Sequence, residues 1–114
     1  MKYIIVYDIS QVKNRKELSD YLLSERFIRI QKSVFLGDAS LKEIKRIMKE
    51  CNDLIKNKND SIIIYPICRE DLNKSVFIGV TFDIETLERF KYFITYWGDE
   101  YENVDNLWYS QYKN

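Results

Sequence analysis

Asp8 is the residue of this sequence best placed to do chemistry. It stands near the end of residues 2–9, an apolar and aromatic run typical of a buried β-strand. A carboxylate at the carboxyl end of such a strand, exposed by the following turn, can hold a hard cation such as Mg²⁺. Because Mg²⁺ takes about six oxygen ligands, one carboxylate is a poor site unless a two-fold dimer supplies two copies. The alternative, which spacing alone favours, is that Asp8 only turns the chain.

The sequence contains no histidine, and this excludes several kinds of active site. It has no imidazole base, no Ser-His-Asp or Cys-His pair and no histidine ligand for zinc. The three glycines, at positions 37, 79 and 98, cannot form a GxGxxG or Walker loop. Any acid-base or metal chemistry must therefore come from carboxylates, Lys, Tyr, Cys or water.

A group of basic residues is the second candidate for function. Lys13, Arg15 and Lys16 follow Asp8 in the loop and first helical turn, and Arg29 lies inside a predicted strand. Such side chains contact the phosphates of nucleic acids. A solvated helix face explains residues 13–16 equally well, but it does not explain a mid-strand arginine.

The net charge of zero hides two halves of opposite sign. Residues 1–58 hold 13 basic and 8 acidic residues, whereas residues 59–114 hold 5 basic and 10 acidic ones. This asymmetry indicates an anionic partner for the first half and a different partner for the second.

Two amphipathic helices are predicted in the first half of the chain. Residues 14–27 carry apolar side chains at helical spacing, namely Leu18, Tyr21, Leu22 and Phe27. Ser40 and Glu43 form a capping box at the start of the second helix. Behind it runs an apolar stripe of Leu41, Ile44, Ile47, Met48, Cys51, Leu54 and Ile55.

Three further strands are predicted around these helices. Residues 28–36 alternate and indicate a single strand, with one mostly apolar face that Lys32 interrupts. Arg29 and Phe35 lie on its other, largely polar face, and no residue near its middle favours a turn. Residues 61–67 form a strand in which Pro66 indicates that the strand leaves the sheet at this point or lies on its edge. A polar turn over residues 69–73 then leads into a strand over residues 74–80.

The rest of the chain has a weaker pattern. Residues 84–97 fit a helix, and the aromatic run 90–97 fits a strand that pairs with another chain as an alternative. The acidic and aromatic end, residues 99–114, is expected to dock on a partner.

Together these elements predict an α+β domain of the ferredoxin-like class, an antiparallel sheet with two helices on one face. We expect this domain to span residues 1–80, with residues 81–114 as a C-terminal extension for dimer completion or partner docking. The order strand, helix, strand, helix, strand, strand departs from the standard motif. Cys51 and Cys68 form no CxxC and indicate reduced, buried or half-buried thiols. No signal peptide or membrane span is recognised, so we expect a cytoplasmic protein without a membrane partner.

Three motifs resemble those of a known family. They are VYDIS at residues 6–10, RIQKSVFLG at 29–37 and IYPIC at 64–68. In order and rough spacing they resemble the motifs of the CRISPR-associated small endonuclease family. Its members are the dimeric partners of the integrase in spacer acquisition.

The resemblance implies a ferredoxin-like homodimer in which two Asp8 side chains face each other and hold Mg²⁺ or Mn²⁺. It also implies that some members cleave RNA or DNA phosphodiesters. Tyr7, Asp8, Arg15, Arg29 and Phe35 match residues that matter for cleavage there. Asp8 would bind metal and orient or deprotonate water, and the two arginines would hold phosphate, whereas Phe35 fits a packing role equally well. The sequence departs from the pattern at Glu17, where some members carry a basic residue, and in its longer tail.

The family's other implied role is a scaffold that lays double-stranded protospacer DNA across its basic surface and bridges two integrase dimers. Single-stranded RNA is a second candidate for the bound nucleic acid. The scaffold role needs residues 13, 15, 16 and 29 and a C-terminal docking segment, but it does not need Asp8. An alternative from another class is a ferredoxin-like regulatory dimer that binds a small molecule and no nucleic acid.

Overall fold

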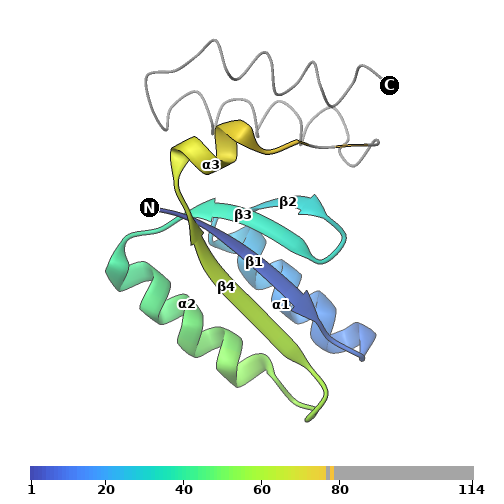
Figure 1. The fold of residues 1–114 in the computed structure, drawn as a ribbon. Helices are drawn as coiled ribbons and strands as arrows, with labels where there is room; N and C mark the ends of the chain where they lie inside the picture. Colours follow the sequence, from blue (N-terminus) through green and yellow to red (C-terminus); the bar gives the residue numbers. More distant parts are fainter. Residues whose placement is uncertain (77, 79–114) are drawn as a thin grey trace. The chain divides into compact units, whose positions relative to one another are not determined.

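A computed structural model describes residues 1–76 and 78 of the chain. The chain divides into two compact units, Met1–Pro66 and Ile67–Asn114. The described elements, in chain order, are β1 (Lys2–Asp8), α1 (Val12–Ser24), β2 (Ile28–Gln31), β3 (Val34–Asp38), α2 (Leu41–Leu54), β4 (Ser61–Ile67) and α3 (Arg69–Lys74) (Figure 1).

The four strands form one sheet in the order β2-β3-β1-β4. β3 runs antiparallel to both β1 and β2, and the arrows of β1 and β4 point in opposite directions in Figure 1. The first six elements therefore follow the βαββαβ order with an antiparallel sheet, which is the ferredoxin-like arrangement. The predicted α+β class is confirmed, and Pro66 lies on an edge strand as expected.

The prediction of one strand over residues 28–36 is wrong, because this segment is a β-hairpin. β2 and β3 are joined by a turn at Lys32 and Ser33. Among the described residues only Arg26, apart from glycine, has a positive φ, so this turn needs no Gly or Asn. Beside the turn, the pairing of β2 with β3 shifts its register between Arg29 and Gln31. This hairpin places two strands between α1 and α2, as the standard motif requires, where the predicted order had only one.

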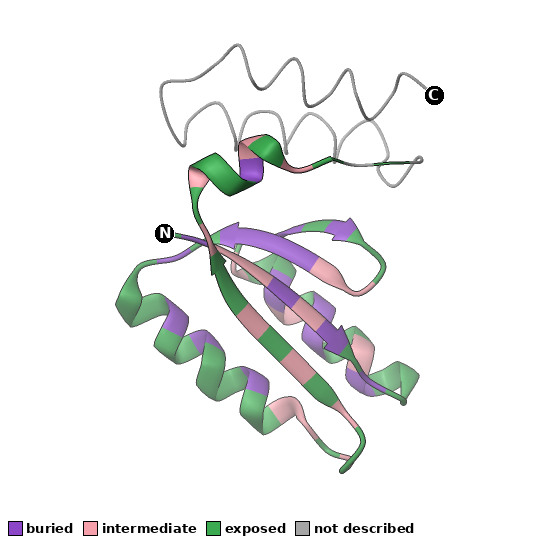
Figure 2. Cartoon of the chain, in the orientation of Figure 1, coloured by how far each residue is buried: buried purple, intermediate pink, exposed green. Residues whose placement is uncertain are grey.

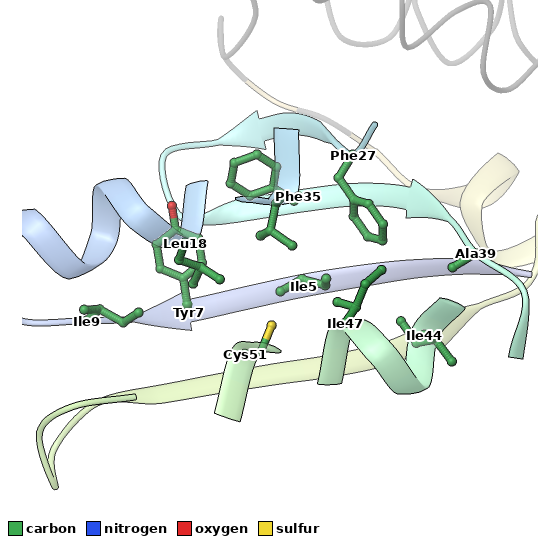
Figure 3. Close-up of a cluster of buried hydrophobic side chains, with 11 residues drawn as sticks. Ile5, Tyr7, Ile9, Leu18, Phe27, Phe35, Ala39, Ile44, Ile47 and Cys51 are labelled. Carbon is green, nitrogen blue, oxygen red and sulfur yellow. The ribbon is translucent and has the colours of Figure 1, made fainter. Parts of the chain in front are cut away.

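One face of the sheet carries both helices. Ile5 of β1 lies opposite Phe35 of β3, and both belong to a buried cluster with side chains from α1 and α2 (Figure 3). Phe35 is fully buried, which confirms the packing role kept open for it, although the strand face that carries it was predicted to be largely polar. A Cβ on Gly37 would lie 2.4 Å from the ring of Phe27, so only glycine fits at this position of β3.

The second helix forms as its sequence predicts. Ser40 is the N-cap of this helix, and its hydroxyl accepts a hydrogen bond from the backbone N–H of Glu43 at 3.1 Å. The Glu43 carboxylate in turn accepts one from the backbone N–H of Ser40 at 3.0 Å. Ile44, Ile47 and Cys51 are buried against the sheet, as the one-sided burial of α2 in Figure 2 shows. Two members of the predicted stripe, Leu41 and Met48, are exposed instead.

The segment after β4 differs from its prediction. Residues 69–74 form α3, a short helix capped by Cys68, where we expected a turn and the first residue of a strand. Residues 75, 76 and 78 of the strand predicted over 74–80 are described and are not in a strand. The helix predicted over 84–97 and the docking tail over 99–114 lie outside the described residues. The extension over 81–114 stays a prediction. No helix among the described residues is both long and apolar enough to span a bilayer.

The two cysteines differ in environment. Cys51 is buried as predicted, whereas Cys68 is exposed, which contradicts the expectation of two covered thiols. Burial, together with the neighbouring Glu50 carboxylate, raises the pKa of the Cys51 thiol to about 11. At pH 8 roughly one Cys51 thiol in a thousand is therefore a thiolate, which is the form that reacts.

We expect an alkylating reagent at pH 8 to label Cys68 rapidly and Cys51 only after unfolding. Peptide mass spectrometry of the native and denatured protein measures both sites. The variant Cys68→Ser should show no rapid labelling. Equal rates for the two thiols in the native protein would contradict the described environment of Cys51.

Candidate functional site

Four of the residues singled out in the sequence line one pocket. Tyr7, Arg15, Lys16 and Arg29 surround a cavity of about 190 Å³. The remaining lining residues are Val12, Ser19, Lys32 and Ser33. Four of these eight side chains are cationic and none is acidic, so the pocket is a site of positive potential that favours an anion.

The arginine of β2 is held by a buried aromatic pair. The Arg29 guanidinium carbon lies 5.1 Å from the centroid of the Phe35 ring, within the range of a cation–π contact. Phe35 in turn stacks on Tyr7, with ring centroids 6.1 Å apart and an interplanar angle of 24°. Because both rings are buried, the guanidinium rests on a rigid support at the pocket wall.

Tyr7 also links β1 to the hairpin turn at Lys32 and Ser33. Its hydroxyl donates to the carbonyl of Lys32 at 3.4 Å, and its backbone N–H donates to the carbonyl of Ser33 at 3.1 Å. These bonds place the Lys32 and Ser33 backbone beside β1. The turn is therefore positioned by the same residue that supports Phe35.

The cations of the pocket differ in their partners. The Lys16 ammonium pairs with Asp20 at 2.7 Å in an exposed i,i+4 ion pair, a kind that contributes little stability. Within the described part of the chain, Arg15, Arg29 and Lys32 make no ion pair. Their charge is thus available to a ligand. Lys13 is exposed and does not line the pocket, so it is not brought together with the other predicted phosphate-binding residues.

Asp8 is separate from this pocket. It is the exposed last residue of β1 and does not line the cavity. Side chains alternate along a strand, and Tyr7 belongs to the helix-covered core, so Asp8 projects toward the opposite face of the sheet. The arrangement therefore brings together Tyr7, Arg15, Lys16 and Arg29, but it does not bring Asp8 to them within one chain.

Asp8 alone is an incomplete metal site. No group of three or more His, Cys, Asp or Glu residues that could hold a metal ion occurs among the described residues. Its two carboxylate oxygens are of the hard type that Mg²⁺ and Mn²⁺ prefer, and a second copy of the chain would double them. Water and phosphate oxygens normally complete such a shell. The donor chemistry fits the ion only if two chains share it.

Four pocket residues were not singled out in the sequence, namely Val12, Ser19, Lys32 and Ser33. In the single-strand interpretation Lys32 interrupted an otherwise apolar face. That interruption was the available signal, because a lysine between apolar positions marks a place where the chain leaves the sheet. Nothing in the helical spacing of Val12 and Ser19 distinguishes them.

Comparison with known proteins identifies the family. Residues 1–75 match the model of a family described as CRISPR associated protein Cas2. A protein of Korarchaeum cryptofilum named CRISPR-associated endoribonuclease Cas2 is 30% identical over 79 residues, which cover 69% of this chain and 85% of the relative. A second protein of that name, Cas2 2 of Pyrobaculum aerophilum, is 28% identical over 79 residues, covering 69% and 87%.

A solved structure supports the fold. The crystal structure of Streptococcus pyogenes Cas2 at pH 6.5 matches with a TM-score of 0.62 and 21% identity, over 69% of this chain and all of the other. The family match spans β1 to α3 and includes Asp8 and every residue of the basic pocket. The chain belongs to the Cas2 family of CRISPR-associated proteins.

Proposed function

We propose that the chain acts in CRISPR adaptation as a homodimeric scaffold that binds double-stranded protospacer DNA and bridges integrase dimers. The observation that carries this proposal is the basic pocket of Arg15, Lys16, Arg29 and Lys32. A nucleic acid presents phosphates at regular spacing. Arg and Lys side chains that neutralise these phosphates supply most of a protein's sequence-independent affinity for nucleic acid. Membership of the Cas2 family supports the adaptation role.

The size and lining of the pocket favour this function over a small-molecule one. A cavity of about 190 Å³ is smaller than the roughly 300–1,000 Å³ of sites that enclose drug-sized ligands. Arginine forks match the geometry of phosphate oxygens. A regulatory dimer for a small metabolite would gain little from four cations around so small a space.

We propose phosphodiester cleavage as a second activity of the same dimer. Two related proteins carry the name endoribonuclease, which supports RNA as the substrate of cleavage. The exposed Asp8 carboxylate would contribute oxygen ligands to Mg²⁺ or Mn²⁺ shared with the second copy, and it can accept a hydrogen bond from the attacking water. A bound divalent ion would supply charge neutralisation at the phosphate and a more acidic water.

Integrase docking is proposed for residues 81–114. The second half of the chain is acidic and the tail is rich in aromatic side chains, a composition suited to a protein partner. We expect deletion of residues 81–114 to prevent co-purification with the cognate integrase, whereas Asp8→Ala should leave co-purification and spacer integration unchanged.

The same experiment can contradict the scaffold proposal. If the truncated protein keeps its mass as a dimer and still binds the integrase, docking does not depend on this segment. If full-length protein neither binds duplex DNA nor supports integration with the integrase, the scaffold function itself is wrong. Nucleic-acid affinity that is absent or independent of salt would favour the small-molecule alternative.

A further inference from the structure

A hydrogen-bonded cluster fixes the chain directly after Asp8. Oδ1 of Asp60 accepts two hydrogen bonds from Ser10, one from its backbone N–H at 3.0 Å and one from its hydroxyl at 3.1 Å. Nδ2 of Asn57 donates to the same hydroxyl at 3.4 Å. Asp60 and Asn57 belong to the loop between α2 and β4, some 50 residues further along the chain. The loop thus holds the end of β1.

The residues on both sides of Asp8 are held as well. Tyr7 is buried and its N–H bonds to the hairpin turn at Ser33. Ile9 is only 2% exposed and belongs to the core cluster. The Asp8 carboxylate itself makes no hydrogen bond or ion pair within the described part of the chain. An exposed carboxylate without partners therefore projects from a backbone that is fixed at residues 7, 9 and 10.

The two carboxylate oxygens of Asp60 differ in their hydrogen bonding. Its second oxygen, Oδ2, is buried and has no hydrogen-bond partner among the described residues. A buried polar atom without a partner is unfavourable for folding, so the hydrogen bonds of Oδ1 must offset this cost. A charged acceptor makes stronger hydrogen bonds than a neutral one. The described contacts of that acceptor all go to Ser10, two residues after Asp8.

We propose that Asp60 is a positioning residue for Asp8: through Ser10 it orients the carboxylate that receives the divalent ion. This inference rests on the metal-binding role of Asp8 proposed above. Groups that orient a metal ligand without touching the ion typically change metal affinity or activity about 10- to 100-fold when they are removed. Asp60 would act in this way from the loop before β4.

The test compares Mn²⁺ binding, measured by titration calorimetry, in full-length dimeric protein. Asp60→Ala removes the acceptor of both Ser10 bonds, and we expect Mn²⁺ binding to weaken about tenfold or more. Asp60→Asn loses the charge but keeps an oxygen in the place of Oδ1, so we expect a smaller loss that stays within about threefold of wild type. Asp53→Ala changes an exposed carboxylate of α2 in the same way and should have no effect.

Amide hydrogen exchange in metal-free protein supplies a second readout. The Ser10 N–H should exchange faster in Asp60→Ala and remain protected in Asp60→Asn. If Asp60→Ala does not fold, Ser10→Ala removes both bonds of the hydroxyl, the one to Asp60 and the one from Asn57, and keeps the backbone bond to Asp60. It should weaken Mn²⁺ binding by about threefold.

Three results would overturn the inference, and they differ from one another. Unchanged Mn²⁺ affinity in Asp60→Ala, or in Ser10→Ala where the first variant is unfolded, would show that the cluster does not position Asp8. Equal loss in Asp60→Asn and Asp60→Ala would make Asp60 a direct ligand instead. A wild-type protein that binds no Mn²⁺ would contradict the proposed metal role of Asp8, and the positioning role with it.

Discussion

Replacing Asp8 by asparagine is expected to reduce metal-dependent cleavage by about 100-fold or more while leaving the fold, the dimer and DNA affinity intact. Asparagine keeps the size of the side chain but loses the negative charge that a hard divalent ion requires. Asp8 is exposed and does not line the basic pocket, so neither core packing nor phosphate contacts should change. Single-turnover cleavage of RNA and DNA substrates with Mg²⁺ or Mn²⁺ measures the effect.

Two controls accompany this prediction. Asp53→Asn removes an exposed carboxylate from α2 and should cleave at the wild-type rate. Chelation of divalent ions should reproduce the loss seen with Asp8→Asn, because both remove the same centre. Cleavage by Asp8→Asn at an unchanged rate would exclude Asp8 as the metal residue.

The double variant Arg15→Gln, Arg29→Gln is expected to bind duplex DNA about 10- to 100-fold more weakly at moderate salt. Hydrogen bonds to charged groups contribute about 1.5–3 kcal/mol each, and part of this is recovered by water. The logarithm of affinity should also fall less steeply with the logarithm of salt concentration, by about 0.9 for each phosphate contact that is lost. Titrations at several salt concentrations measure both quantities.

The matched control for the arginine variant also removes two positive charges, but from the exposed surface of α2. Lys45→Gln, Lys49→Gln removes two exposed cations of α2 that do not line the pocket. Its affinity should fall less than that of the arginine variant. Arg29→Lys keeps the charge but not the planar fork over Phe35, so an intermediate loss is expected. Equal losses in the two double variants would mean that the pocket has no special role.

The sequence predicted the elements whose signals are local. β1 is a continuous apolar run and α2 begins with a capping box, and both features depend only on near neighbours. The β2-β3 hairpin could not be predicted in this way. Its turn uses Lys32 and Ser33 without a positive φ, so the usual Gly or Asn signal is missing.

The placement of Phe35 shows a second limit of local pattern. Alternation correctly puts Arg29 and Phe35 on the same side of the sheet, where they lie opposite each other. The polar neighbours suggested that this side faces solvent. In the structure β2 is an edge strand, so Arg29 reaches the pocket while Phe35, one strand further in, is covered by the core.

The candidate site was predicted as a set of residues but not as an arrangement. Tyr7, Arg15, Lys16 and Arg29 do meet in one pocket. The separation of Asp8 from them depends on which face of β1 the helices cover, and this is a tertiary property. The link from Asp60 to Ser10 joins residues that are 50 positions apart and has no sequence signal without a known fold.

The most direct test of the account is the duplex DNA affinity of three full-length proteins measured side by side at one salt concentration. We predict that Asp8→Asn binds as tightly as wild type and that Arg15→Gln, Arg29→Gln binds at least about tenfold more weakly. Tight binding by the arginine variant, or loss of binding in Asp8→Asn, would contradict the proposal that the basic pocket holds the nucleic acid and that Asp8 serves a separate function.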